Sequence, residues 1–323
     1  MNAFAKLGRK VFGSYSRAEK KRFLFAYALV AVPLLQLIVF WLYVNFDSIA
    51  LAFRDAEGAF TFKNFRDVWY GFTVEDRYGF NIGEMLGRTV LLWFVANGPV
   101  FIISLATTYV LFRKVTGHYV FRIIFLIPGL VGSVVWCALF KYIVAYDGPV
   151  LELLKSLGTE LPTLVLRNGL LGASETGYPT IVWMTIMMGI VGGSAILTSA
   201  YARIPHDLFE FGQLEGVGFW REFVTIVLPC VWPTIATLIT FSVCGIFTAD
   251  GNVFLLTNGT GEPDMSTMGY YLYYMTYRIS QSSTSINDYN YPAAVGLCIT
   301  IITVPVALAV RRILDKATEP VAF

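Results

Sequence analysis

Six long apolar runs, separated by polar segments, constrain the fold of this chain more than any other feature of its sequence. Each run is close to the ~20 residues that a helix needs to cross a hydrocarbon core of roughly 30 Å. The fourth and fifth runs contain no charged residue at all. We therefore expect an all-α fold with six transmembrane helices, at residues 23–46, 89–112, 123–142, 180–200, 231–249 and 292–314.

Composition indicates a polytopic membrane protein. Hydrophobic residues make up 56% of the chain and charged residues 14%, whereas soluble domains average roughly 45–50% and 25%. The first run is too long for the apolar part of a signal peptide and has no small-residue cleavage site, so we expect it to remain as a span. Nothing divides the rest of the chain, and we expect one membrane domain over residues 23–314.

The distribution of basic residues predicts the orientation. The segments expected inside hold 15 of the 24 basic residues and only 7 of the 22 acidic ones. This asymmetry satisfies the positive-inside rule and places both terminal tails, 1–22 and 315–323, in the cytoplasm. The inside segments are 1–22, 113–122, 201–229 and 311–323. The outside loops are too long for bare connectors, so we expect small helical caps on which a partner can sit, at 47–88, 145–179 and 251–291.

The polar loop between the fourth and fifth runs, residues 201–229, predicts a compact helical elbow. Pro205 suits the start of a helix, and Asp207 followed three residues later by Glu210 approximates a capping box. The helix should end near Leu214 and present one apolar face, with Glu210 beside it, to a groove on a partner. That face holds Leu208, Phe211 and Leu214.

The second half of this loop predicts a sharp turn. Gly216 and Gly218 permit positive φ, after which residues 219–227 can resume a helix. We expect Pro229 and Pro233 to interrupt that helix as it re-enters the bilayer.

The spacing of Glu210, Gly216 and the run Ile226, Leu228 and Pro229 resembles the EAA loop, the coupling loop of bacterial ABC importer permeases. The alternative interpretation is an ordinary cytoplasmic loop. The resemblance implies a type I importer permease fold and a role in coupling to an ATPase. The match departs from the family where Phe211 and Gly212 replace two alanines. The coupling residues implied are Glu210, Leu214, Glu215, Gly216 and Pro229.

A second stretch, residues 255–278, resembles the L-T-x-G-G-P segment of carbohydrate-uptake permeases, especially the maltose-permease-like subunit. Thr260 and Glu262 interrupt its Gly-Gly-Pro, and the alternative is a Gly/Pro-rich turn at a helix end. Pro33 and residues 61–65 also resemble that subunit group. The substrate class implied is carbohydrate.

The resemblance also implies the partners. They are a second six-span permease forming a heterodimer, two copies of a cytoplasmic ABC ATPase that carry ATP and Mg, and an extracytoplasmic sugar-binding protein. The implied location is a bacterial cell membrane, where the chain contacts lipid.

Catalytic and cofactor motifs are missing from the sequence. No G-x-x-x-x-G-K-[ST] occurs, so nucleotide hydrolysis is expected on another chain, and no nucleophilic triad, metal-ligand spacing or nucleic-acid-binding stripe is present. The spans hold almost no ionisable groups, which a proton- or sodium-coupled transporter would usually display. We expect a transport subunit, with no enzyme activity and no cofactor or metal of its own.

Small and polar residues in the third to fifth spans suggest a substrate pathway. Thr240, Cys244, Thr248 and Asn252 recur every four residues, which predicts a helical stripe with Asp250 at its outer end. Small residues leave room for a sugar ring in the fourth span, and Trp136 offers an aromatic face near Lys141. Each could equally be ordinary helix-packing or snorkelling material. The glycines of the fourth span are Gly189, Gly192 and Gly193.

The resemblance implies alternating access driven by ATPase docking at the Glu210 loop. Two alternatives remain at this stage. The same architecture could import an amino acid or polyamine, or the chain could be a membrane scaffold or channel that transports nothing.

Overall fold

The computed structural model describes residues 17–76, 79–113, 115, 117–192, 194–260, 262–282 and 285–317. Over these residues the chain is almost wholly helical, and the only β pairing in them is an isolated bridge between Arg54 and Phe60. The expected helical fold is therefore confirmed for this part of the chain. The first sixteen residues of the expected basic tail, and the last six residues of the other tail, lie outside the described residues.

The elements follow one another with short connections. In chain order they are α2 (Arg17–Gln36), η1 (Leu37–Tyr43), α3 (Val44–Ala52), α4 (Lys63–Tyr70), α5 (Ile82–Asn97), α6 (Pro99–Phe112), α7 (His118–Leu130), α8 (Ser133–Ile143), α9 (Pro149–Ser156), α10 (Thr163–Asn168), η2 (Leu170–Gly172), α11 (Ser174–Gly192), α12 (Ser194–Tyr201), α13 (His206–Leu214), α14 (Phe219–Glu222), η3 (Phe223–Val227), α15 (Leu228–Cys244), α16 (Val253–Thr257), η4 (Pro263–Met265), α17 (Met268–Ser282), η5 (Ile286–Tyr289) and α18 (Asn290–Ala317).

Four helical stretches of the described chain are long and apolar enough to cross a membrane, judged by length and composition. They are Lys21–Ala52, Ile82–Phe112, Phe219–Cys244 and Ile286–Lys316. These stretches contain the first, second and sixth predicted spans and most of the fifth, and they extend beyond the predicted bounds because helix continues into the polar flanks. The chain is thus a multi-pass membrane protein.

The third predicted span is interrupted and the fourth contains a residue outside the described ones, so the count of six stays a prediction. Extended backbone at Val131 and Gly132 separates α7 from α8. The fourth predicted span is helical in α11 and in α12, and Gly193 between them lies outside the described residues. The expected helical caps are confirmed, because α4, α9, α10, α16 and α17 all form within the predicted outside loops.

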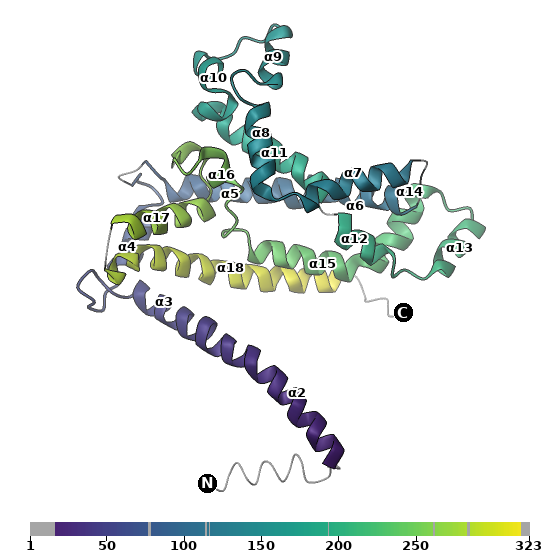
Figure 1. Ribbon diagram of the computed structural model, residues 1–323, viewed down its shortest axis with the longest axis horizontal. Coiled ribbons are helices and arrows are strands. Elements are labelled where there is room, and N and C mark those ends of the chain that lie inside the picture. The colour runs from purple at the N-terminus through teal and green to yellow at the C-terminus, as the bar shows by residue number, and fades with distance from the viewer. Residues whose placement is uncertain are drawn as a thin grey trace.

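Two hydrophobic cores hold the bundle together, one towards each end of its long axis. The first core includes buried residues of α4, α5, α8, α11, α17 and α18, and the second joins α6, α12, α13 and α15. Figure 1 shows α13 at one end of the bundle and α4 and α17 at the other. We refer to these as the α13 end and the α17 end.

The N-terminal rod, α2 to α3, diverges from this bundle (Figure 1). No residue in the most apolar 18-residue window of this rod is buried by the rest of the chain. The mean hydropathy of that window is nevertheless the second highest among the four long stretches. A rod with apolar side chains on every side is stable only in an apolar environment, which a bilayer supplies.

Candidate coupling loop and translocation cavity

Helix α13 spans His206–Leu214, so the predicted short helix and its end at Leu214 are confirmed. Phe211 and Leu214 are 65% and 84% exposed. Leu208 instead packs against the second core and does not belong to the exposed face. The side chain of Glu210 is also exposed. An exposed Phe–Leu pair beside a carboxylate, at one end of a membrane bundle, is a surface that a partner can cover.

The predicted capping box at the start of α13 is wrong. Pro205 occupies the N-cap position, and no side chain accepts a hydrogen bond from the first turn there. Glu210 turns instead towards His206, with 3.0 Å between Oε1 and Nδ1. The physical reason is position: with proline at the cap, Asp207 lies inside the first turn and cannot act as the capping residue.

Gly216 ends α13 in a Schellman motif, and the positive φ predicted for this glycine is confirmed. Its φ is +69°, its N–H donates to the carbonyl of Gln213 (3.1 Å), and the N–H of Val217 donates to that of Gly212 (2.9 Å). The prediction for Gly218 is wrong, because its φ is −69° and it precedes α14 in an extended conformation.

Replacing Gly216 with alanine should lower the stability of the chain, because a Cβ costs about 1–2 kcal/mol in the left-handed region. Gly218→Ala is the matched control, since a Cβ meets nothing within 4 Å at either glycine and only their φ values differ. Thermal unfolding of the detergent-solubilised protein should give a lower midpoint for the first variant than for the second. Equal midpoints would contradict the strained-turn account.

The two prolines do not interrupt the re-entering helix, and that prediction is wrong. Helix runs without a break over Phe219–Cys244. Pro229 lies in the first turn of α15, where a missing N–H costs little, and the wider π-turn η3 precedes it. Pro233 lies inside α15.

Glu222 is the residue that the sequence interpretation missed. It belongs to the polar loop 201–229, yet its side chain is only 2% exposed. Tyr109 Oη donates to its Oε1 at 2.6 Å, and Arg113 lies at 3.2 Å from each carboxylate oxygen, through Nε and Nη2. A signal was available, because Glu222 lies directly between Phe219 and Phe223 on the apolar face of a helix. The carboxylate fixes the start of the fifth-span helix to the end of α6.

A cavity of about 500 Å³ lies between α5, α11 and the C-terminal part of α15 with the turn after it. Among the predicted pathway residues, Gly189 and Asn252 lie in its lining. A Cβ on Gly189 would come within 2.5 Å of Val100 Cγ1, so the glycine allows α11 to approach α6. The second span supplies a wall that the sequence interpretation overlooked, with lining residues Thr89, Leu92, Trp93, Ala96 and Asn97.

Three polar side chains form a hydrogen-bonded chain in this wall. Trp93 Nε1 donates to Ser242 Oγ (2.7 Å), and Ser242 Oγ donates to Asn97 Oδ1 (2.6 Å). The amide of Asn97 donates to the Trp93 carbonyl at 3.0 Å. The lining is otherwise mostly apolar, so an indole face beside an amide and a hydroxyl suits a ligand with both apolar and hydroxylated surfaces.

The predicted helical stripe in the fifth span is wrong beyond Cys244. Helix α15 ends at Cys244, with Gly245 as its C-cap, and Thr248 is exposed in the following turn. Asp250 Oδ1 accepts the N–H of Asn252, which has positive φ. A local turn of this kind competes with helix for the same backbone groups.

The remaining predicted pathway residues lie outside the lining of this cavity. Thr240 donates to the Ala236 carbonyl of its own helix. Trp136 lies half-buried on α8, where Lys141 donates to the Leu255 carbonyl and to Asn258. Gly192 ends α11, and Gly193 lies outside the described residues.

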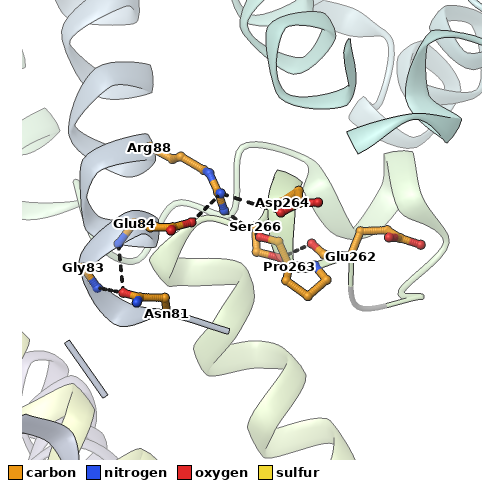
Figure 2. Close-up of polar contacts among 8 residues, drawn as sticks. All are labelled: Asn81, Gly83, Glu84, Arg88, Glu262, Pro263, Asp264 and Ser266. Atoms are coloured by element: carbon orange, nitrogen blue, oxygen red, sulfur yellow. Dashed lines mark hydrogen bonds and ion pairs between the residues drawn. The ribbon is translucent and has the colours of Figure 1, made fainter. Parts of the chain in front are cut away.

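Arg88 fastens the cavity wall at the α17 end (Figure 2). Its guanidinium donates to the Pro263 carbonyl (2.6 Å) and to Glu84 (2.9 Å), and Asp264 lies at 4.0 Å. One helical position further on, Thr89 Oγ1 accepts the N–H of Met268 (2.9 Å). These contacts fix α5 to the turn that contains the segment resembling L-T-x-G-G-P.

The fold defined by these elements is that of an ABC importer permease. It matches the crystal structure of a bacterial ABC transporter involved in the import of the acidic polysaccharide alginate, with a TM-score of 0.73 over 94% of this chain and 100% of that chain, at 17% identity. The bacterial alginate ABC transporter in complex with an alginate pentasaccharide-bound periplasmic protein gives a TM-score of 0.71, at 17% identity, over 94% and 98% of the two chains.

Sequence relatives include permeases of sugar transport systems. The chain is 22% identical to the multiple sugar-binding transport system permease protein MsmF of Streptococcus mutans, over 91% of this chain and 93% of that protein. It is 26% identical to the trehalose transport system permease protein SugA of Mycobacterium tuberculosis, over 60% of each. No protein-family model matches the chain. The resemblance to permease subunits of carbohydrate-uptake ABC importers is confirmed by these relatives.

Proposed function

We propose that this chain is a transmembrane permease subunit of an ATP-driven carbohydrate importer. The observation that carries the proposal is the connection between the exposed surface of α13 and a cavity whose wall holds the hydrogen-bonded chain of Trp93, Ser242 and Asn97. Helix α13 exposes Phe211 and Leu214, while Phe209 on the same helix is 3% exposed in the second core with residues of α15. A partner that moves α13 would therefore move the helix whose other end reaches the cavity.

The partner proposed for α13 is a cytoplasmic ABC ATPase. The chain has no phosphate-binding Gly-rich loop of its own. One relative is named as a permease of a multiple sugar-binding transport system, and one structure with the same fold is an ABC transporter in complex with a sugar-bound periplasmic protein. In this proposal two ATPase copies and a second permease complete the membrane complex, with α13 and both termini in the cytoplasm. A sugar-binding protein delivers substrate at the α17 end.

Alternating access is the mechanism that we propose. ATP must interact differently with the two conformations of the complex, because a ligand with equal affinity for both shifts nothing. Closure of the ATPase pair would displace α13 and Gly216, and the continuous helix Phe219–Cys244 would transmit that displacement to the cavity. The cavity would then open towards the binding protein.

Carbohydrate is the proposed cargo because of the cavity wall as well as the relatives. Trp93 offers an aromatic face, and Asn97 and Ser242 offer hydrogen-bonding groups, within about 500 Å³. An amino acid or a polyamine carries charge, and no charged side chain is found among the described residues that line this cavity. A neutral or hydroxyl-rich solute fits that lining better.

A deletion strain of the host bacterium tests the proposal. Uptake of radiolabelled maltose, trehalose and alginate oligosaccharides should be measured beside glutamine and spermidine, with the gene supplied on a plasmid. We expect plasmid-dependent uptake of at least one of the carbohydrates. Purification of the tagged chain in mild detergent should also capture an ABC ATPase, identified by mass spectrometry. Absence of any ATPase would contradict the importer proposal, and uptake of only glutamine or spermidine would contradict the carbohydrate assignment.

A further inference from the structure

The buried carboxylate of Glu222 connects the loop that contains α13 to the second span. Both of its oxygens are engaged, Oε1 by Tyr109 Oη and Arg113 Nε and Oε2 by Arg113 Nη2, at 2.6–3.2 Å. Removing one partner from a buried ion pair leaves an uncompensated charge, which is far more costly than moving the pair as a unit. The ion pair therefore holds helix α14 against the end of α6.

Arg113 also reaches α13 itself. Its guanidinium carbon lies 5.3 Å from the centroid of the Phe209 ring, a cation–π distance, and Phe112 lies 6.0 Å from the same ring. Arg113, the residue directly after α6, thus contacts both α13 and α14. Tyr109 is wholly buried against Phe219 and Phe223, with ring centroids 4.8 and 4.9 Å away.

The second span carries this connection to the cavity. Helix α6 meets α5 at Gly98, whose unusual backbone (φ −95°, ψ −101°) makes a joint between the two helices. A Cβ at Gly98 would lie 2.7 Å from the Phe94 carbonyl oxygen, so the joint depends on glycine. Beyond it, Trp93 and Asn97 of α5 form the cavity wall opposite Ser242 of α15.

We propose that Arg113 and Glu222 are positioning residues that carry movement of the α13 loop into the second span. Two cavity walls, α15 and α5, then move in one step. The inference rests on the proposed function and adds a route to it, because α15 alone would move only one side of the hydrogen-bonded chain formed by Trp93, Ser242 and Asn97. Separating the two walls breaks that chain, and moving them together preserves it.

The test compares uptake with ATP hydrolysis in Glu222→Gln and Arg113→Met. Glutamine keeps the shape and the hydrogen-bond acceptor for Tyr109, so this variant should assemble even if Arg113→Met does not. We expect ATPase capture and ATP hydrolysis by the purified complex to stay within about twofold, while cellular uptake of the radiolabelled carbohydrate panel falls about tenfold, within the usual range of coupling free energies. The double variant should be no worse than either single variant. Arg113→Lys, which keeps the charge, should recover part of the loss.

The matched controls are Arg311→Met and Asp315→Asn. These two residues form an ion pair of 2.8 Å on a single helix, α18, and both are partly exposed, so they join no separate elements. They should leave uptake and hydrolysis unchanged. If both Glu222→Gln and Arg113→Met keep full uptake, or lose uptake and hydrolysis in proportion, the second-span route is overturned while the importer proposal stands. If the unmodified chain captures no ATPase, the proposed function fails instead.

A readout that needs no sugar uses paired spin labels at residues 102 and 213, after replacement of the four native cysteines. Residue 102 lies on α6 and residue 213 on α13, and both positions are exposed. We expect one narrow distance distribution that stays unchanged when ATP and vanadate are added to the assembled complex. In Arg113→Met the same addition should shift or broaden it. A distribution identical to that of the unmodified chain would overturn the inference.

Discussion

Leu214→Asp is expected to abolish carbohydrate uptake while the permease remains inserted in the membrane. Leu214 is 84% exposed in the free chain, so the aspartate should cost the fold little. Buried against an ATPase, however, an unpaired carboxylate would cost several kcal/mol, and each 1.4 kcal/mol lowers affinity tenfold. We therefore expect ATPase capture to fall by more than about a hundredfold. Quantitative mass spectrometry of the purified complex measures it.

Leu157→Asp controls for the introduction of a charge at an exposed leucine. Leu157 follows α9 and is 70% exposed, in a segment far along the chain from the α13 loop. ATPase capture by this variant should equal that of the unmodified chain. If Leu214→Asp captures as much ATPase as Leu157→Asp, α13 is not the docking surface.

Ser242→Phe is expected to abolish uptake by a different route, at the cavity. The larger side chain would fill space between α5 and α15 and would leave the Trp93 indole N–H and the Asn97 amide oxygen without their shared partner. Unsatisfied buried groups cost about 1–3 kcal/mol each, and overpacking adds a similar amount. Uptake of every member of the carbohydrate panel should fall to background in the complemented strain, with ATPase capture retained.

Thr240→Val is the control for the cavity prediction. Thr240 lies on the same helix, but its hydroxyl donates to the Ala236 carbonyl and it does not line the cavity. Uptake should remain close to that of the unmodified chain. Normal uptake by Ser242→Phe, or equal losses in both variants, would show that this cavity is not the substrate pathway.

Apolar run length and turn chemistry made much of this fold predictable. Each of the six runs contains helix, α13 ends at Leu214 as expected, and Gly216 has the positive φ that its turn needs. These features depend on local sequence alone. The spacing of Glu210, Gly216 and Pro229 also led to the correct class of relatives, the ABC importer permeases. This signal depends only on the order of residues along one short segment.

Tertiary context explains what the sequence did not reveal. The role of Glu222 was missed because its partners, Tyr109 and Arg113, lie more than a hundred residues away in the chain. The polar cavity wall on α5 was missed for the same reason, since Trp93 and Asn97 acquire meaning only beside Ser242.

Backbone competition explains the helix boundaries that were predicted wrongly. Periodicity extended the stripe through Thr248 and Asn252, but Gly245 and the turn formed by Asp250 end the helix first. Conversely, Pro229 and Pro233 were expected to interrupt a helix that in fact continues through both of them. Side-chain spacing alone does not determine whether the backbone forms helical hydrogen bonds or those of a local turn.

Labelling of a single cysteine at residue 213 tests the central claim most directly. Gln213 is exposed on α13, between the Phe211 and Leu214 that we place against the ATPase. In a background without the four native cysteines, a membrane-impermeant maleimide should fail to label it in intact cells and should label it in inverted vesicles stripped of the ATPase. Labelling in intact cells would place α13 outside the membrane and contradict the importer account.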